Sequence, residues 1–227
     1  MTRPYDVITF DCYGTLIDWE GGIRAAFTEA AARDGFPLDP AQALAAYGEI
    51  EPVVEAEAYR SYRAVLTETA GRVARRLGWS LPPDRTAFLA QSLPAWRPFP
   101  DTNAALEGLA GAGYRLGILS NVDDDLLAAT RRHFTVPIDF VVTAQQVGSY
   151  KPAHNHFVTA RQLIGARRWL HAAQSYFHDL VPARALGVPA AWINRKGEQA
   201  LDGGRPDREL TNLTGLADWL APVGQRA

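Results

Sequence analysis

The chain has little cysteine and lysine and no long apolar run. Its single cysteine, Cys12, excludes an internal disulfide and favours a reducing cytoplasm. No apolar run approaches membrane-spanning length, and the first residues lead into a predicted strand without a charged and apolar leader. The 25 acidic and 23 basic residues nearly balance and form no basic block, which gives no reason to expect nucleic acid or an anionic membrane as a partner. We therefore expect a cytoplasmic protein that acts on a small molecule.

Lysine is scarce among the basic residues, because only Lys151 and Lys196 stand beside many arginines. Much of that arginine reflects genomic base composition. A lysine that is present despite this bias is therefore mild evidence for a functional role at its position. The 227 residues are 47% hydrophobic and 21% charged, which is an ordinary globular composition. This length and composition suffice for one large domain or two smaller ones.

The stretch Tyr5–Trp19 (YDVITFDCYGTLIDW) holds the first chemical signal. It begins as a buried strand over residues 7–10 and stops at Asp11. In open parallel α/β sheets, ligands bind outside the carboxyl ends of the strands, where Asp11 would lie. Gly14 allows a sharp turn beside the carboxylate, and Thr15 can donate a hydrogen bond to it. Taken alone, Asp11 could equally well have a structural role, as a turn residue or a helix N-cap, as a chemical one.

The rest of the chain divides by pattern into a helical part and an alternating part. No segment between about residues 21 and 96 resembles a buried strand, and a proline-rich boundary follows at 94–101. From there, predicted helices and short strands alternate, which favours a parallel sheet covered on both faces. The predicted fold class is therefore α/β, with a core domain over 1–20 and 97–227 and a helical domain over 21–96. Predicted elements include a long helix near 52–77 and a mobile polar loop over 196–208.

Four polar positions follow predicted strands far apart in the sequence. They are Asp11, the pair Ser120 and Asn121, Lys151, and Asp179. Each has an ordinary structural explanation, as a turn, a helix cap or a solvated surface lysine. A parallel sheet would bring these strand ends side by side, so their convergence is stronger support for a site than any single residue.

These positions resemble the four motifs of the haloacid dehalogenase superfamily. The sequence FDCYGTL around Asp11 is similar to the first motif, whose aspartate is the nucleophile. Ser120-Asn121 resembles the second motif and Lys151-Pro152 the third. Asp179 matches the acidic position of the fourth, with Ala183–Gly187 following as in the family. The resemblance implies a Rossmann-like three-layer core and a small all-helical cap inserted after the first strand.

Tyr13 separates two branches of this superfamily. The phosphatase branch carries a second aspartate two residues after the nucleophile, which protonates the leaving alcohol. Here that position is Tyr13, as in the 2-haloacid dehalogenase branch, and a departing halide needs no proton. The segment Ala191–Arg195 also resembles that branch. The resemblance therefore implies an (S)-2-haloacid dehalogenase-like hydrolase.

The implied mechanism has two steps. Asp11 displaces halide from C2 of a short 2-haloalkanoate with inversion and forms an ester. Water then attacks the ester carbonyl, which releases a 2-hydroxy acid and regenerates the aspartate. The resemblance makes Thr15 a hydrogen-bond donor to Asp11, and it makes Asp179, paired with Lys151, the group that activates the water. Backbone amides near Cys12 and Tyr13, together with the Ser120-Asn121 pair, would bind the substrate carboxylate.

The residues around the substrate depart from the dehalogenases. Those enzymes carry an arginine early in the cap that contacts the halide, but no arginine occurs between Arg33 and Arg60 here. Arg60 is therefore taken as the substrate-binding arginine, with Arg63 as its alternative. The fourth-motif turn carries a serine and an asparagine in the dehalogenases and reads Gln174–His178 (QSYFH) here, so Ser175 is assigned a catalytic role and Tyr176 a substrate-binding role. His178 receives no role.

Other activities remain open from the sequence. A magnesium-dependent phosphatase of a small metabolite would use Asp11 and Asp179 on the metal. A hydrolase of the same branch could instead act on another small carboxylate, and a catalytically inactive binding module is a further alternative. We expect no metal and no cofactor. A homodimer through the helices of the cap, such as 59–77, is the assembly we consider.

Overall fold

In the computed structural model, residues 3–200 and 204–221 are described, and they fall into two compact units. The first consists of Met1–Ile17, Pro98–Asn121 and Arg132–Ala227 and contains the sheet. The second consists of Asp18–Arg97 and Val122–Arg131 and is helical. The sequence-based boundaries placed 122–131 in the core domain, whereas the structure groups this segment with the helices.

The sheet of the first unit has six parallel strands in the order β3-β2-β1-β4-β5-β6. All four residues of β1 are fully buried, as expected of the central strand of a covered parallel sheet. In the register of this sheet, Phe10 lies opposite both Ile118 and Ala172, so β1, β2 and β4 end side by side. The strands are β1 (Val7–Phe10), β2 (Arg115–Ser120), β3 (Phe140–Thr143), β4 (Trp169–Ala173), β5 (Ala190–Ile193) and β6 (Arg208–Leu210).

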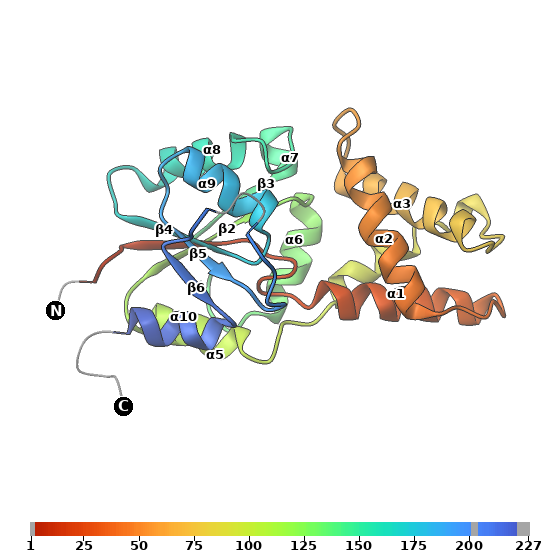
Figure 1. Cartoon of the computed structure of the whole chain (residues 1–227), viewed down its shortest axis with the longest axis horizontal. Helices are drawn as coiled ribbons and strands as arrows, with labels where there is room; N and C mark the ends of the chain where they lie inside the picture. The colour runs from red at the N-terminus through yellow and green to blue at the C-terminus, as the bar shows by residue number, and fades with distance from the viewer. Residues whose placement is uncertain (1–2, 201–203, 222–227) are drawn as a thin grey trace. The chain divides into compact units, whose positions relative to one another are not determined.

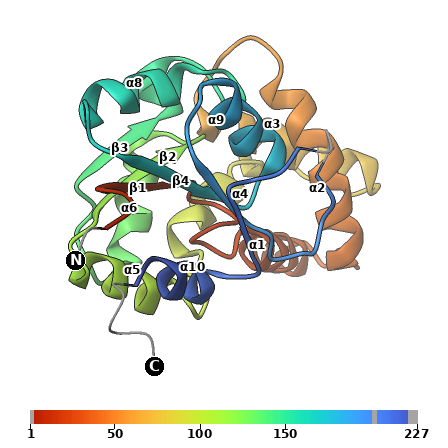
Figure 2. The same cartoon turned by 60° about the vertical axis from the view of Figure 1, so that its left-hand side comes forward.

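Helices cover both faces of this sheet (Figure 1). One face carries α5 (Thr102–Gly111) and α10 (Leu213–Leu220), which pack against each other, and the other carries α8 (Asn155–Ile164) and α9 (Val181–Ala185). The same two layers are seen in the turned view of Figure 2. A short helix, α7 (Ala144–Val147), follows β3. This three-layer α/β arrangement confirms the predicted fold class.

The helical unit is built from amphipathic helices with side-chain N-caps. Asp18, Asp39 and Ser61 each accept a hydrogen bond from a backbone N–H in the first turn of the helix that follows. Aromatic rings fill its core, for example Phe36 stacked on Trp79 with centroids 5.5 Å apart. Its elements are α1 (Trp19–Arg33), α2 (Pro40–Glu55), α3 (Tyr62–Arg76), α4 (Phe88–Ser92), α6 (Asp124–Thr130) and the 3-10 turns Pro83–Arg85 and Leu93–Ala95.

The predicted long helix over 52–77 is interrupted in the structure. Two helices occupy this region: α2 ends at Glu55, and α3 begins at Tyr62, after its N-cap Ser61. The Asp123 carboxylate accepts the N–H groups of Tyr62 and Arg63 at 2.8 and 2.9 Å. These bonds satisfy two of the donors that every helix start leaves without an intrahelical partner. Contacts between residues 60 and 61 positions apart therefore fix this helix boundary.

The predicted polar loop over 196–208 meets an edge strand at its last residue. The edge strand β6 begins at Arg208 and pairs with β5, while residues 201–203 of the loop lie outside the described residues. Within the described parts of the chain, no helix has both the length and the apolar character needed to cross a membrane.

Candidate active site

The carboxyl end of β1 places Asp11 at the centre of a buried polar cluster in the sheet-containing unit. The chain turns sharply after Asp11, because Gly14 adopts a positive φ of 97° and the N–H groups of Leu16 and Ile17 both donate to Cys12 O. The turn brings Thr15 back onto the carboxylate, where its Oγ1 donates to Asp11 Oδ2 at 2.9 Å.

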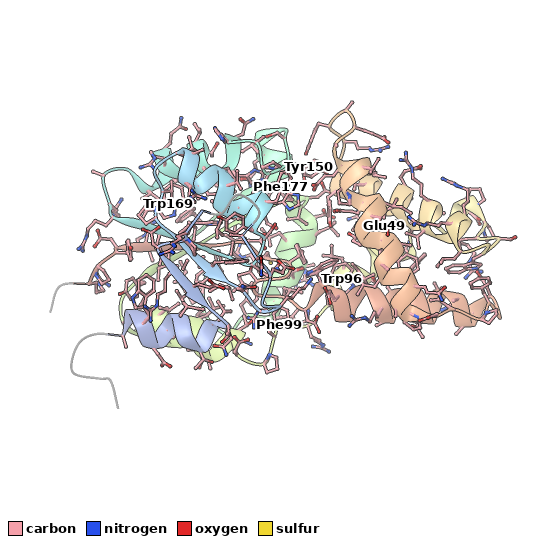
Figure 3. All side chains as sticks on the ribbon, in the orientation of Figure 1. Glu49, Trp96, Phe99, Tyr150, Trp169 and Phe177 are labelled. Atoms are coloured by element: carbon pink, nitrogen blue, oxygen red, sulfur yellow. The ribbon has the colours of Figure 1, made fainter. Side chains whose placement is uncertain are left out.

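The Thr15 hydroxyl has a defined direction. It accepts the backbone N–H of Gln174 at 2.9 Å, so its single hydrogen points to Asp11. The backbone of Thr15 is held as well, because Arg195 Nη2 donates to Thr15 O at 3.0 Å and pairs with Asp101. Arg195 also lies over the ring of Phe99, which is labelled in Figure 3, at 3.9 Å from its centroid. The turn that follows Asp11 is therefore anchored from two neighbouring segments.

Lys151 is 2% exposed and links the two carboxylates that the sequence analysis singled out. Its Nζ donates to Asp11 Oδ1 at 2.9 Å, to Asp179 Oδ1 at 2.6 Å and to Leu119 O at 2.9 Å. Because an ammonium has three hydrogens, these bonds use all of them. Lys151 lies in a turn that precedes α8 and is joined to Pro152 by a cis peptide bond.

Asp179 is fully buried, and its two oxygens differ. Oδ1 accepts from Lys151 and lies 2.9 Å from His171 Nε2, whereas the buried Oδ2 has no hydrogen-bond partner among the described residues. His171 lies within β4 and was missed by the sequence analysis, where it formed part of a strand. The available signal was a histidine inside a continuously buried strand, eight residues before an acidic site residue.

Burial and charge set the ionisation of this cluster. Burial raises the pKa of Asp11 above its usual value; Lys151 opposes this rise, and the negative charge of Asp179 adds to it. Burial would also raise the pKa of Asp179, but Lys151 and His171 lower it to about 2. For Lys151 the two carboxylates outweigh the effect of burial, so its pKa lies above the usual value. Asp179 and Lys151 are therefore charged at neutral pH, and the Lys151 ammonium also favours the charged form of Asp11.

Ser120 and Asn121, the pair that resembles the second motif, make different contacts. The buried Ser120 Oγ has no hydrogen-bond partner among the residues described, and the Ser120 carbonyl lies 3.1 Å from His156 Nε2. The Asn121 side chain instead bonds the backbone of Lys151 at both its oxygen and its nitrogen. Cys12 is buried beside Asp11, and burial raises the pKa of its thiol well above the usual value.

In the turn that resembles the fourth motif, Ser175 is linked to the cluster by a backbone hydrogen bond to Asp179. Ser175 O accepts the N–H of Asp179 at 3.2 Å, and its Oγ lies 3.0 Å from His178 Nδ1. Ser175 is the N-cap of a π-helical turn, Tyr176–Leu180. Burial lowers the pKa of His178.

Two of the expected substrate-binding residues have other partners. The Tyr176 hydroxyl donates to Gly204 O and lies 3.0 Å from Arg184 Nη1, and its ring packs on Trp192. Arg60 belongs to the helical unit and pairs with Glu57 at 2.5 Å. Neither is joined to Asp11 by these contacts.

The donor set favours a fixed ammonium over a divalent metal ion between the two carboxylates. Mg²⁺ requires near-octahedral oxygen coordination, and the facing oxygens, Asp11 Oδ1 and Asp179 Oδ1, already bind the Lys151 ammonium. In the described parts of the chain, no group of three or more His, Cys, Asp and Glu residues is arranged to hold a metal.

A three-layer parallel α/β core, with a buried carboxylate at the end of its central strand that a lysine joins to a second carboxylate, is the arrangement that the resemblance to the haloacid dehalogenase superfamily implies. The family model of haloacid dehalogenase-like hydrolases matches residues 5–201, and the chain belongs to this family. This confirms the resemblance inferred from the motifs.

Individual relatives cover nearly the whole chain. It is 27% identical to (S)-2-haloacid dehalogenase H-109 of Pseudomonas putida, over 96% of this chain and 99% of the relative. It is 26% identical to the (S)-2-haloacid dehalogenase of Pseudomonas sp. (strain YL), over 97% and 96%. Its fold matches the L-2-haloacid dehalogenase from Xanthobacter autotrophicus solved with chloropropionic acid covalently bound, with a TM-score of 0.82, 19% identity and coverage of 97% and 99%.

Proposed function

We propose that the protein hydrolyses short 2-haloalkanoic acids to 2-hydroxy acids through an ester on Asp11. The observation that carries the proposal is the lysine bridge, in which Lys151 Nζ lies 2.9 Å from Asp11 Oδ1 and 2.6 Å from Asp179 Oδ1. It holds a nucleophile and a candidate base in fixed positions beside one another. The similarity to (S)-2-haloacid dehalogenases over nearly the full chain supports the same reaction.

In the first step, an Asp11 oxygen attacks C2 of the substrate, and the carbon–halogen bond breaks as the halide leaves with its electron pair. Attack from the side opposite the halogen inverts C2. Thr15 and Lys151 hold the carboxylate through one oxygen each, which fixes the direction of attack. No proton is needed by the departing halide, in keeping with Tyr13 at the position where the phosphatase branch has a general acid.

In the second step, Asp179 accepts a proton from a water that attacks the ester carbonyl carbon. The bond from that carbon to the alcohol oxygen then breaks, and the second proton of the water passes to that oxygen. The 2-hydroxy acid leaves, Asp11 is again a carboxylate, and Asp179 gives its proton to the solvent. Asp179 Oδ2 suits this role, because it is buried and has no hydrogen-bond partner among the described residues.

The substrate carboxylate would be bound beside the nucleophile. We assign it to the Ser120 hydroxyl and to backbone amides near Cys12 and Tyr13. Asn121 would contribute indirectly, through the Lys151 backbone. Arg60 remains the proposed contact for the halide, and Ser175 and Tyr176 remain proposed site residues by their position in the fourth motif.

We further propose that the reaction needs no metal, because the lysine ammonium supplies the positive charge between the two carboxylates. The phosphatase alternative would instead require magnesium to bridge the phosphoryl oxygens. Halide release in the presence of a chelator separates these alternatives.

The decisive experiment measures halide release from racemic 2-chloropropionate by the wild type and by Asp11→Asn, with and without EDTA. Release by the wild type that persists in EDTA and disappears in Asp11→Asn is the expected result. The exposed Asp84 provides the matched control Asp84→Asn, which should retain full activity. No release by the wild type would contradict the proposal, and a panel of phosphate esters with Mg²⁺ would then test the phosphatase.

Three broader expectations complete the proposal. The helical residues 21–96 act as the cap of a core formed by 1–20 and 97–227, the protein works in the cytoplasm, and two copies form a homodimer. Light scattering after size exclusion tests the dimer, and limited proteolysis tests whether the two parts are separate domains.

A further inference from the structure

A line of buried side chains from β1 and β4 leads to Asp179. Trp169 Nε1 donates to Thr9 Oγ1 at 2.7 Å, and Thr9 Oγ1 lies 2.8 Å from His171 Nδ1. His171 Nε2 in turn lies 2.9 Å from Asp179 Oδ1. Trp169, labelled in Figure 3, is 5% exposed, and the other three are fully buried.

With a neutral imidazole, the hydrogens along this line can run in only one direction. The indole of Trp169 can only donate, so Thr9 accepts there and has its own hydrogen for His171 Nδ1. With Nδ1 accepting, a neutral His171 carries its hydrogen on Nε2 and donates it to the acceptor-only Asp179 carboxylate. Every donor and acceptor named is then satisfied without a charge on the imidazole.

We propose that His171 is a positioning residue for the ester-hydrolysis step, an inference that rests on the proposed function. Its Nε2–H and the Lys151 ammonium both bind Asp179 Oδ1, which prevents the carboxylate from rotating and keeps Oδ2 as the oxygen that receives the proton from water. Lys151 also binds Asp11, whereas His171 bonds only one of the two carboxylates, that of Asp179. His171 therefore affects the second step selectively.

The competing explanation is that His171 only fills the core. It packs edge-on against Phe157, with ring centroids 5.0 Å apart, as a structural histidine would. The two explanations differ in what His171→Leu changes. Loss of packing lowers stability and both chemical steps together, whereas loss of positioning slows ester hydrolysis and leaves the first displacement intact.

The first test follows Asp179 and does not depend on activity. Aspartate carboxyl groups labelled with ¹³C are titrated by NMR in the wild type and in His171→Leu, and Asp179→Asn identifies the signal. We expect Asp179 to titrate at higher pH in His171→Leu, because a donor to its charged form is lost. Labelling histidine with ¹⁵N should also show His171 as the neutral tautomer with hydrogen on Nε2. An unchanged Asp179 titration overturns the proposal.

The second test separates the two chemical steps with 2-chloropropionate. In His171→Leu, we expect the first equivalent of halide at the wild-type rate and amplitude. Turnover should then be slower by roughly 10- to 100-fold, since one hydrogen bond to a charged group is lost. The lactyl ester should accumulate on the protein, as seen by mass spectrometry. His171→Gln, which can still donate, should recover part of the turnover.

Two further variants keep the proposal falsifiable if His171→Leu folds poorly. Thr9→Val removes the group that orients the imidazole and should slow turnover less than His171→Leu, without changing the first halide release. His154→Gln removes an exposed histidine and should behave as wild type. Unchanged turnover in folded His171→Leu, or equal loss of both steps, contradicts the proposal. If the wild type releases no halide, the proposed function fails, while the Asp179 titration still decides whether His171 holds that carboxylate.

Discussion

Asn121 and Lys151 bond each other through an amide side chain and a peptide backbone. Lys151 N donates to Asn121 Oδ1 at 2.7 Å, and Asn121 Nδ2 donates to Lys151 O at 3.1 Å. The asparagine thereby fixes the backbone from which the ammonium reaches both carboxylates. A residue of the second motif thus positions a residue of the third, 30 positions away.

Replacing Asn121 with Leu should displace Lys151 and slow halide release. The two lost hydrogen bonds predict a loss of about 1–3 kcal/mol in unfolding free energy, because buried backbone groups of Lys151 lose their partner. Steady-state kinetics and urea unfolding measure the two effects. Asn121→Asp keeps the acceptor for Lys151 N and should retain more stability; equal stability of wild type and Asn121→Leu would contradict this role.

Thr15→Val removes the hydroxyl that donates to Asp11 Oδ2 while preserving the shape of the side chain. We expect kcat for halide release to fall by roughly tenfold, the effect of one hydrogen bond to a charged group. Thr15→Ser keeps the hydroxyl and is the matched control, which should retain most of the activity. Activity that is retained in Thr15→Val and lost in Thr15→Ser would show that the methyl group, rather than the hydroxyl, is what matters.

Lys151→Met should destabilise the protein by about 3–5 kcal/mol at neutral pH, because it leaves two buried carboxylates without their positive partner. The pKa values of both carboxyls in the folded variant should then exceed their unfolded values. Its stability should therefore rise as the pH falls and the folded carboxyls take up protons. Urea unfolding between pH 5 and pH 8 provides the measurement, and Lys151→Met/Asp179→Asn should recover part of the loss.

His156 should make the stability of the wild type decrease in acid. Burial and the charge of Lys151 lower its pKa to about 3, while an unfolded histidine titrates near the ordinary value of about 6.5. Between these values the unfolded chain binds one more proton, so the unfolding free energy falls by about 1.4 kcal/mol per pH unit as the pH decreases. His156→Gln should flatten the dependence in this range. Asp179, with a pKa of about 2, contributes only in stronger acid, below about pH 4.

The sequence predicted the meeting of Asp11, Lys151 and Asp179 because parallel strands place their carboxyl ends at one edge. That argument uses only the order of strands and polar residues along the chain, which are local signals. It did not identify His171, because the available signal, a histidine inside a buried strand, does not by itself separate a hydrogen-bonded role from simple burial.

Two other differences between the predicted and the observed elements have the same kind of cause. The start of α3 depends on the Asp123 carboxylate, which comes from a distant part of the chain. The strand β6 has three residues, none of them fully buried, so its sequence lacks a recognisable alternation. It exists because β5 offers an edge to pair with. In each case a distant partner, rather than local propensity, sets the boundary.

The cluster of Asp11, Lys151 and Asp179 also has an electrostatic consequence for the proposed reaction. When Asp11 is ionised, as attack on the substrate requires, two carboxylates and one ammonium give the cluster a net charge of −1 in a buried site. Once Asp11 becomes a neutral ester, Lys151 and Asp179 balance each other and the cluster is uncharged. The same burial that raises the pKa of Asp11 thus destabilises the charged starting state relative to the ester. The departing halide carries the excess negative charge away, and hydrolysis restores it for the next cycle.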